Sequence, residues 1–330
     1  MKLTQLAYKT LRDTGSDAET SSHALLLQAG FIHQLGAGIY SYLPLALKAI
    51  KNIESIIRYE MDKTGAQEIL MPHIQPQELW DLTGRTTAFG DNLFTLKDRR
   101  QRGLVLAPTH EESVTTISKS IIQSYKDLPF TLYQIQTKFR DEARPRAGLI
   151  RVREFSMKDA YSFSANEDSL DEIYESMAIA YKNIYQKCEI PVLMAEADSG
   201  AIGGKDSHEF IYPTESGEDT VITCSNCQYT ANVEKAIGIL PAENHDTEAP
   251  QAEISTPGVT TIEEVCNFLN INANQTLKSL CYSADGQLVM VCIRGDLNIN
   301  EVKLKHILNA TELRAASTAE IEQEGLVLGS

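Results

Sequence analysis

Two strand-like runs in the middle of the chain, joined by a short loop, constrain the fold more than any other feature of the sequence. The runs cover residues 132–142 and 150–157, and the loop between them reads Ala-Arg-Pro-Arg-Ala-Gly-Leu. In both runs β-branched, aromatic and other apolar residues alternate with polar ones, which is typical of strands. Strands joined by so short a loop pair in an antiparallel manner. The sequence therefore predicts an antiparallel sheet.

Three amphipathic helices are predicted around this sheet. Residues 46–61 and 166–188 each carry an apolar stripe at helical spacing with charged residues between. A further helix is predicted to begin at Thr109, where Thr-His-Glu-Glu fits a capping box with Glu112, and to run toward Tyr125. Helices and an antiparallel sheet together indicate an α+β fold.

A domain boundary is predicted within residues 241–258, an acidic segment with three prolines and almost no large apolar side chain. Beyond it the pattern predicts a helix from Thr260 or Thr261 through Leu269. A buried strand over residues 288–294 and a helix over residues 300–308 follow. These elements form a small α/β unit.

The charge of the chain is divided between its halves. The net charge is −15, which taken alone argues against a nucleic-acid partner. Residues 1–160, however, carry 21 basic and 18 acidic side chains, whereas residues 161–330 carry 9 and 27. Anion-binding chemistry is therefore expected in the first half.

Membrane and secretory classes are excluded by the hydropathy pattern. The longest apolar run, Leu288 to Ile293, is far shorter than the ~20 residues of a membrane helix, and the N-terminus lacks the apolar core of a secretory signal. The six cysteines are too sparse for a disulfide framework, so a cytoplasmic location is predicted. Cys224 and Cys227 form a C-x-x-C pair, which would supply only half of the ligands of a tetrahedral zinc site. A structural turn is therefore the favoured interpretation of this pair.

The two predicted strands offer a surface for a nucleoside polyphosphate. Alternation places Gln134, Gln136, Lys138, Arg140 and Glu142 on one face of the first strand, and Arg151, Arg153 and Phe155 on one face of the second. Arginine matches phosphate oxygens, a carboxylate accepts from the adenine amino group, and phenylalanine stacks on a base.

The alternative is that this is only the solvated face of an antiparallel sheet, where polar residues are common. Six basic residues among the sixteen from Lys138 to Arg153 favour the nucleotide interpretation. Because the sequence contains no P-loop motif, a P-loop would not hold the phosphates.

The segment KFRDEARPRAGLIRVREFSMKDAYSF (138–163) resembles the second signature motif of class II aminoacyl-tRNA synthetases, specifically the bacterial prolyl-tRNA synthetases. The predicted first helix, followed by a short strand over residues 68–71 that ends at Pro72, resembles the first motif, which forms the dimer interface in that family. The segments LAPTHEE, GAIGGKDSHEF and CSNCQYTANVEKA are also similar, and the unit after the linker resembles the family's inserted editing domain.

The resemblance implies ATP with Mg²⁺ as its metal, L-proline and tRNA(Pro) as substrates, and a homodimer. Arg140 would hold the α-phosphate of ATP, and Glu142 would accept from the adenine amino group. Phe155 would stack on the base, and Arg151 would orient the phosphates or the loop. The products would be prolyl-adenylate and then prolyl-tRNA.

The resemblance also implies a proline pocket and an editing site. Thr109 and Glu111 would line the pocket, although Thr109 also fits a helix cap. His208 would contact proline, or it is a satisfied structural histidine in a strand. Lys278 would serve the hydrolysis of mischarged alanyl-tRNA, or it is a surface lysine at the start of a strand.

The implied division of the chain is a catalytic domain over residues 1–223, a connecting segment and linker over residues 224–257, and a partial editing domain over residues 258–330. The family's third motif and its anticodon-binding domain are not found, so a truncated chain is expected. Two alternatives stay open. One is a non-catalytic module that dimerises or binds tRNA, and the other is a free-standing deacylase of mischarged tRNA.

Overall fold

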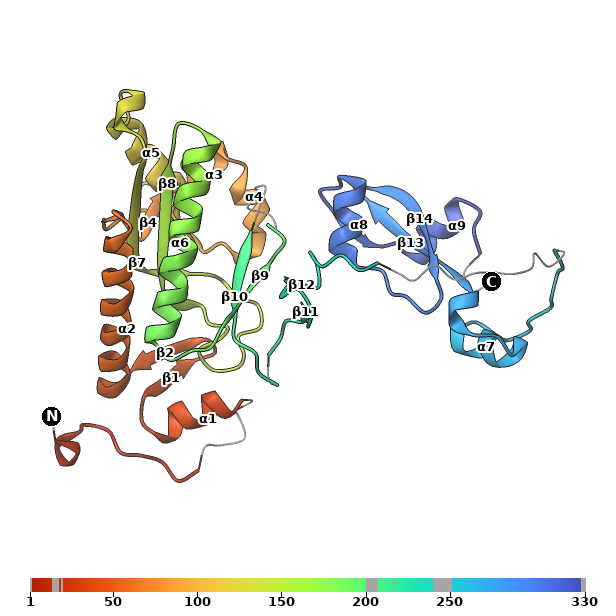
Figure 1. Cartoon of the computed structure of the whole chain (residues 1–330), viewed down its shortest axis with the longest axis horizontal. Helices are drawn as coiled ribbons and strands as arrows, with labels where there is room; N and C mark the ends of the chain where they lie inside the picture. Colours follow the sequence, from red (N-terminus) through yellow and green to blue (C-terminus); the bar gives the residue numbers. More distant parts are fainter. Residues whose placement is uncertain are drawn as a thin grey trace. The chain divides into compact units, whose positions relative to one another are not determined.

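The computed structural model describes residues 2–13, 18, 20–199, 207–215, 217–239 and 251–327 (Figure 1). The chain divides into two compact units. Unit 1 comprises Met1–Val192 and Tyr212–Gly217, and unit 2 comprises Leu193–Ile211 and Glu218–Ser330. Residues 241–250 of the predicted linker and residues 200–206 of the segment GAIGGKDSHEF lie outside the described residues.

The main sheet of unit 1 has the strand order β3-β7-β8. Strands β7 (Phe130–Phe139) and β8 (Glu154–Phe163) pair antiparallel along ten residues each, which confirms the predicted strand pair. The short strand β3 (Gln67–Glu68) adds to β7 in parallel. Helices packed on this sheet confirm the α+β class.

The predicted ends of the two long strands were wrong. β7 ends at Phe139 and β8 begins at Glu154, so Arg140, Glu142 and Arg151 lie in the connecting loop rather than on a strand face. Within the loop, Arg146 and Arg151 form an isolated antiparallel bridge, which doubles the loop back on itself.

Two long helices cover one face of this sheet (Figure 1). They are α2 (Pro44–Lys63) and α6 (Glu167–Lys187), as predicted. α2 starts with a proline in its first turn, and the Asn166 side chain caps α6 by accepting from the backbone N–H of Ser169. Met61, Ala66 and Tyr133 form the buried centre of the contact between the helices and the sheet.

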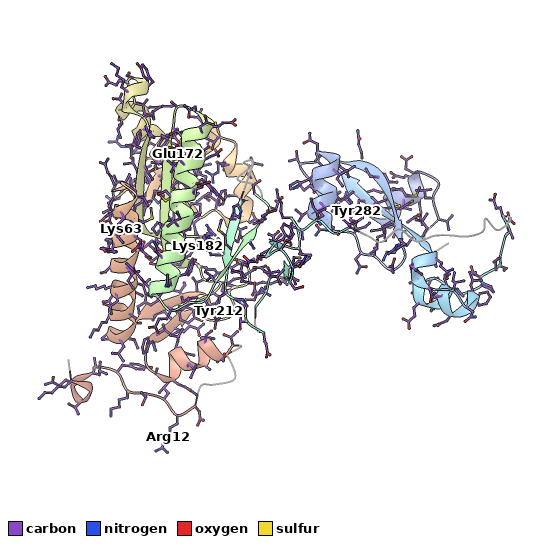
Figure 2. The ribbon with its side chains drawn as sticks, viewed as in Figure 1. Arg12, Lys63, Glu172, Lys182, Tyr212 and Tyr282 are labelled. Carbon is purple, nitrogen blue, oxygen red and sulfur yellow. The ribbon has the colours of Figure 1, made fainter. Side chains whose placement is uncertain are left out.

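A buried carboxylate joins the two helices. Glu60 of α2 is 2% exposed and accepts hydrogen bonds from Lys187 and from Asn183 (3.1 Å), both on α6, and from Lys63 (3.4 Å). The bond from Lys187 is the main cause that lowers the pKa of Glu60 below its ordinary value. Figure 2 shows Lys63 at the end of α2, and Glu172 and Lys182 along α6.

A second sheet in unit 1 has the order β4-β6-β5, with β4 at Ile74–Pro76, β5 at Thr95–Lys97 and β6 at Gly103–Leu106. The helices α3 (Gln77–Leu82) and α4 (Arg85–Phe89) follow β4, and Trp80 is the buried centre of this region. Helix α1 (Ser21–Gln28) and the hairpin of β1 (Ile32–Gly36) and β2 (Ile39–Tyr42) also belong to unit 1.

The predicted capping box at Thr109 was wrong. Helix α5 covers Glu111–Ile121, its cap position is His110, and no side chain caps it. The Thr109 hydroxyl donates instead to Glu111 Oε2, at 2.6 Å. The helix also stops at Ile121, short of the predicted Tyr125, because Ile122 adopts an extended conformation.

The described residues of unit 2 form two sheets. The first has the order β10-β9-β12-β11, formed by Leu193–Glu196 (β9), His208–Ile211 (β10), Val221–Thr223 (β11) and Thr230–Asn232 (β12). The second has the order β14-β13-β15, formed by Leu277–Ala284 (β13), Gln287–Arg294 (β14) and Leu313–Ala315 (β15).

Short helices accompany the second sheet: α7 (Ile262–Leu269), α8 (Glu301–Leu308) and α9 (Thr318–Gln323). The predicted helices after the linker are confirmed, and Thr261 and Asn300 cap them with their side chains. The predicted burial of the strand over residues 288–294 was wrong, because Met290 on β14 is 56% exposed. Tyr282 on β13, labelled in Figure 2, is buried. Among the described helices none is long and apolar enough to cross a membrane.

We expect Glu60→Gln to reduce the stability of unit 1 at neutral pH, because the amide cannot form the ion pair with Lys187. Since folding lowers the pKa of Glu60 below its ordinary value of 4.5, the stabilisation is complete above pH 4.5 and is lost as the pH falls through the folded value. Urea unfolding at a series of pH values should therefore show that the difference in the free energy of unfolding between wild type and variant becomes smaller below that pH. The exposed Glu78→Gln serves as control, and a difference that stays constant with pH would contradict the assignment.

Candidate active site

The polar face of β7 is buried. Gln134 and Lys138 are fully inaccessible to water, and Gln136 is also buried. The interpretation of this face as a solvated sheet surface is therefore wrong. Buried polar groups need partners, and the two glutamines find theirs in the segment that follows β3.

Two glutamines of β7 bond to the backbone of one residue in that segment. Gln134 Oε1 accepts from the N–H of Met71 (3.1 Å), and Gln136 Nε2 donates to its carbonyl oxygen (2.6 Å). Side chains thus take the place of a strand ladder here. This is why β3 ends at Glu68, three residues before the strand end predicted from the sequence.

The ammonium group of Lys138 lies between an acid and an imidazole. Its Nζ is 2.8 Å from Asp159 Oδ1 and 2.8 Å from His110 Nδ1. The other ring nitrogen, His110 Nε2, lies 3.1 Å from the carbonyl oxygen of Pro72. Because the ammonium donates to Nδ1, the imidazole is the neutral form that donates from Nε2.

Burial and the neighbouring Lys138 charge lower the pKa of His110 to about 4, which agrees with a neutral ring at physiological pH. The same network includes Tyr161, whose hydroxyl donates to Asp159 Oδ2 (2.5 Å) and accepts from the backbone N–H of His110 (3.0 Å). Burial and the bond to Asp159 raise the pKa of Tyr161. The network fixes both the ring and the backbone of His110, the residue that precedes α5.

Sequence reasoning missed the roles of His110, Asp159 and Tyr161. A signal was present in the sequence, because Asp159 and Tyr161 lie an even number of positions from Phe155 and so share its face of the strand that pairs with β7. A lysine and an aspartate on the same face of two paired strands predict a buried ion pair.

The four residues predicted to bind ATP line one cavity of about 710 Å³. Arg140, Glu142, Arg151 and Phe155 form its wall at the loop end of β7 and β8. Apolar side chains of α2, including Ile53, also line the cavity. The Arg140 guanidinium lies 5.2 Å from the centre of the Phe155 ring.

Backbone contacts hold this loop in place. The Arg153 N–H donates to the carbonyl oxygen of Gly38 (2.9 Å), and Arg153 Nε donates to the carbonyl oxygen of Glu142 (3.2 Å). Gly38 has a φ of 71°, and a β-carbon there would lie 2.7 Å from Pro145. The β1–β2 hairpin can therefore approach the loop this closely only with glycine at position 38.

The two residues predicted for proline lie together at the start of α5. Glu111 Oε2 accepts from the Thr109 hydroxyl and lies 3.1 Å from Arg85 Nη1. Burial lowers the pKa of Arg85, but the charges of Glu111 and Glu112 outweigh it and raise the value. Burial lowers the pKa of Arg140, and Glu111 opposes that shift, so Glu111 also acts on the predicted nucleotide residue.

The predicted residues His208, Lys278, Cys224 and Cys227 belong to unit 2. His208 lies on β10 and pairs with Glu196 of β9, and Lys278 Nζ on β13 donates to Asn298 Oδ1 at 3.2 Å. Cys224 and Cys227 are free thiols, and backbone N–H groups lower the pKa of Cys224. In the described part of the chain, no group of three or more His, Cys, Asp or Glu residues is arranged to hold a metal ion.

Known proteins provide an independent comparison. Residues 94–252 match the core domain family of class II tRNA synthetases (G, H, P, S and T), and residues 256–330 match the aminoacyl-tRNA editing domain family. The proline–tRNA ligase of Dehalococcoides mccartyi strain 195 is 53% identical over 329 residues, and that of Caldicellulosiruptor saccharolyticus is 49% identical over 324 residues. The chain belongs to the class II aminoacyl-tRNA synthetases. The family predicted from the sequence motifs is confirmed.

These alignments cover 100% and 98% of this synthetase chain, but only 58% and 57% of the two relatives. Its fold resembles the prolyl-tRNA synthetase of Cryptosporidium parvum crystallised with halofuginone and AMPPNP, with a TM-score of 0.52 at 18% identity. That match covers 56% of this chain and 38% of the other. A second crystal structure of the same synthetase, with L-proline and AMP, gives a TM-score of 0.50 at 17% identity.

Replacing Lys138 with methionine should leave Asp159 as an unpaired buried charge and cost about 3–5 kcal/mol of the free energy of unfolding. The double variant Lys138→Met/Asp159→Asn should recover part of that loss, because no charge is then left unpaired. Denaturant unfolding measures both, with the exposed Lys97→Met as control. A loss below about 1 kcal/mol for the single variant would contradict a central role for this ion pair.

Proposed function

We propose that this synthetase chain belongs to a proline–tRNA ligase. Such an enzyme activates L-proline with ATP to prolyl-adenylate and then transfers the prolyl group to tRNA(Pro). The observation that carries the proposal is the cavity at the loop end of β7 and β8, which gathers Arg140, Glu142, Arg151 and Phe155. Relatives that are 46–53% identical and named proline–tRNA ligase support the choice of amino acid.

On the nucleotide side, Arg140 binds the α-phosphate and stabilises the charge that develops there during attack by the proline carboxylate. Glu142 accepts from the adenine amino group, Phe155 stacks on the base, and Arg151 orients the phosphates. Arg140 lies over the ring on which adenine would stack, so its side chain turns toward the phosphates when ATP binds. This reaction needs no protein nucleophile, because the attacking group belongs to the substrate.

Mg²⁺ enters with ATP as part of the substrate. The described residues offer no cluster of three acidic or imidazole side chains for it, and Mg²⁺ commonly keeps waters and binds through substrate phosphates. Bound in this way, it neutralises charge on the phosphates.

On the amino-acid side, the Glu111 carboxylate pairs with the cationic ring nitrogen of proline beside the Thr109 hydroxyl. The side chain of Glu111 is 35% exposed, so a ligand can reach it. His208, on β10 of unit 2, is a further proposed contact to proline.

A homodimer is proposed through the segment that contains Pro72. Leu70 and Ile74, on either side of Pro72, are 77% and 50% exposed, and all three are apolar. An alternating row of exposed apolar side chains is typical of a surface that another protein covers. The cytoplasmic location stays a prediction of the sequence.

Editing of alanyl-tRNA is proposed for the domain over residues 258–330, with Lys278 in its site. A pocket that fits proline excludes the smaller alanine by only about 1–3 kcal/mol, so a second, hydrolytic site improves accuracy. The match of residues 256–330 to the editing domain family supports this role. The preceding catalytic domain and connecting segment keep the proposed bounds 1–223 and 224–257.

Arg140→Ala should reduce proline-dependent exchange of pyrophosphate into ATP by at least about a hundredfold, because the charge on the α-phosphate loses its main partner. The assay uses the complete natural protein, with Arg99→Ala, an exposed arginine of the β5–β6 turn, as control. Near-normal exchange by Arg140→Ala would contradict the phosphate role. Wild-type protein that responds to another amino acid and not to proline would contradict the proposed substrate. Wild-type protein that responds to no amino acid would contradict the proposed function and favour the non-catalytic alternative.

Lys278→Ala should slow hydrolysis of alanyl-tRNA(Pro) by about tenfold or more, since a hydrogen bond from a charged group is worth about 1.5–3 kcal/mol. Pyrophosphate exchange should not change, because Lys278 belongs to the editing domain. Lys305→Ala, on α8 of the same domain, is the matched control. Equal hydrolysis by the wild type and Lys278→Ala would remove Lys278 from the editing site.

A further inference from the structure

Arg85 lies between two carboxylates that follow one another in the sequence. Its Nη1 is 3.1 Å from Glu111 Oε2 and 3.0 Å from Glu112 Oε1. The guanidinium also lies 5.3 Å from the ring centre of Trp80 and 5.2 Å from that of Phe89. Two aromatic rings and two acids therefore restrict its position.

Glu111 and Glu112 differ in their surroundings. Glu112 is buried, and its Oε1 also accepts from the Thr83 hydroxyl at 3.1 Å. Glu111 is partly exposed at the start of α5. The buried Glu112 anchors the guanidinium, and the guanidinium in turn holds the exposed Glu111.

The hydrogen bonds to the Glu111 side chain in the described residues all go to the same oxygen. The Thr109 hydroxyl donates to Oε2 at 2.6 Å, and Arg85 Nη1 donates to Oε2 at 3.1 Å. Two donors on one oxygen fix the rotation of the carboxylate. Oε1 takes part in neither bond and remains an acceptor for a ligand.

We propose that Arg85 is a positioning residue for amino-acid recognition, which holds Glu111 so that Oε1 accepts from the ammonium group of the substrate. The inference rests on the proposed contact between Glu111 and proline, and it adds a residue that does not touch the substrate itself. A carboxylate ordered during folding loses no rotational freedom when the substrate binds, so the affinity for the amino acid is higher.

The test compares Arg85→Met with Arg85→Lys in proline-dependent pyrophosphate exchange by the complete protein. Methionine keeps an apolar side chain against Trp80 and Phe89 but removes every donor. We expect the KM for proline to rise by about tenfold while the KM for ATP changes by less than about twofold. Arg85→Lys, which keeps the charge, should lie between the wild type and Arg85→Met.

A double variant separates positioning from general support of the fold. Glu111→Gln should raise the KM for proline, and adding Arg85→Met should raise it little further, because Arg85 acts through Glu111. If the increases in the KM for proline caused by the two single substitutions multiply in the double variant, the inference is overturned. An unchanged KM for proline in Arg85→Met, or an equal rise of the KM values for proline and ATP, would also overturn it.

If Arg85→Met does not fold, Arg85→Lys decides through the same two KM values. A rise of the KM for proline alone supports the inference, and no change in either KM value overturns it. The inference and the proposed function fail differently. Wild-type protein without proline-dependent exchange refutes the function, whereas normal wild-type exchange with an unaffected Arg85→Met refutes only the role of Arg85.

Discussion

The buried ammonium group of Lys138 is the interaction on which the arrangement of the site depends. An unpaired charge in a protein interior costs several kcal/mol, so the Lys138 position requires both Asp159 and His110. Because His110 must reach Lys138, the residue is held against β7, and its imidazole ring lies against the carbonyl oxygen of Pro72. Thr109 and Glu111, which flank His110 in sequence, are positioned as a consequence.

The same network connects the proposed substrate site with the proposed dimer surface. The segment through Met71 and Pro72 is held by side chains of β7 on its inner side, and Leu70 and Ile74 are exposed. Because side chains rather than a strand ladder satisfy its backbone, the segment can lie across β7 and still leave apolar groups exposed.

Periodicity in the sequence was enough to predict the elements that pack by simple patterns. α2 and α6 each bury one stripe on the sheet, and the antiparallel pair of β7 and β8 follows from the short loop between them. What the pattern could not provide was the end of each strand, because alternation continues through Glu142 while β7 ends at Phe139. The burial of Gln134 also depends on a segment more than sixty residues away in sequence.

Motif similarity predicted the residues that gather at the cavity, but it did not predict Arg85, which lies outside every motif that carried the resemblance. Long-range ion pairs of this kind leave no local pattern, since the bond between Arg85 and Glu111 spans 26 positions. The predicted capping role of Thr109 failed for a different, local reason. The Thr109 hydroxyl donates to the carboxylate of Glu111, two residues later in the sequence, and not to the backbone of the helix.

The two sides of the proposed active site differ in how firmly they are held. Glu111 has two donors on one oxygen, one of them charged, whereas the Arg140 guanidinium faces the Phe155 ring, a contact worth about 0.5–1 kcal/mol at exposed sites. A triphosphate can displace so weak a contact at little cost, because its charge supplies a much stronger partner for Arg140. The amino-acid side has no such charge to use in discrimination, since proline and its competitors share the same ammonium and carboxylate groups. Selection there depends on the shape of the pocket around the rest of the amino acid, and a carboxylate ordered before binding fixes the position of the ammonium group relative to that pocket.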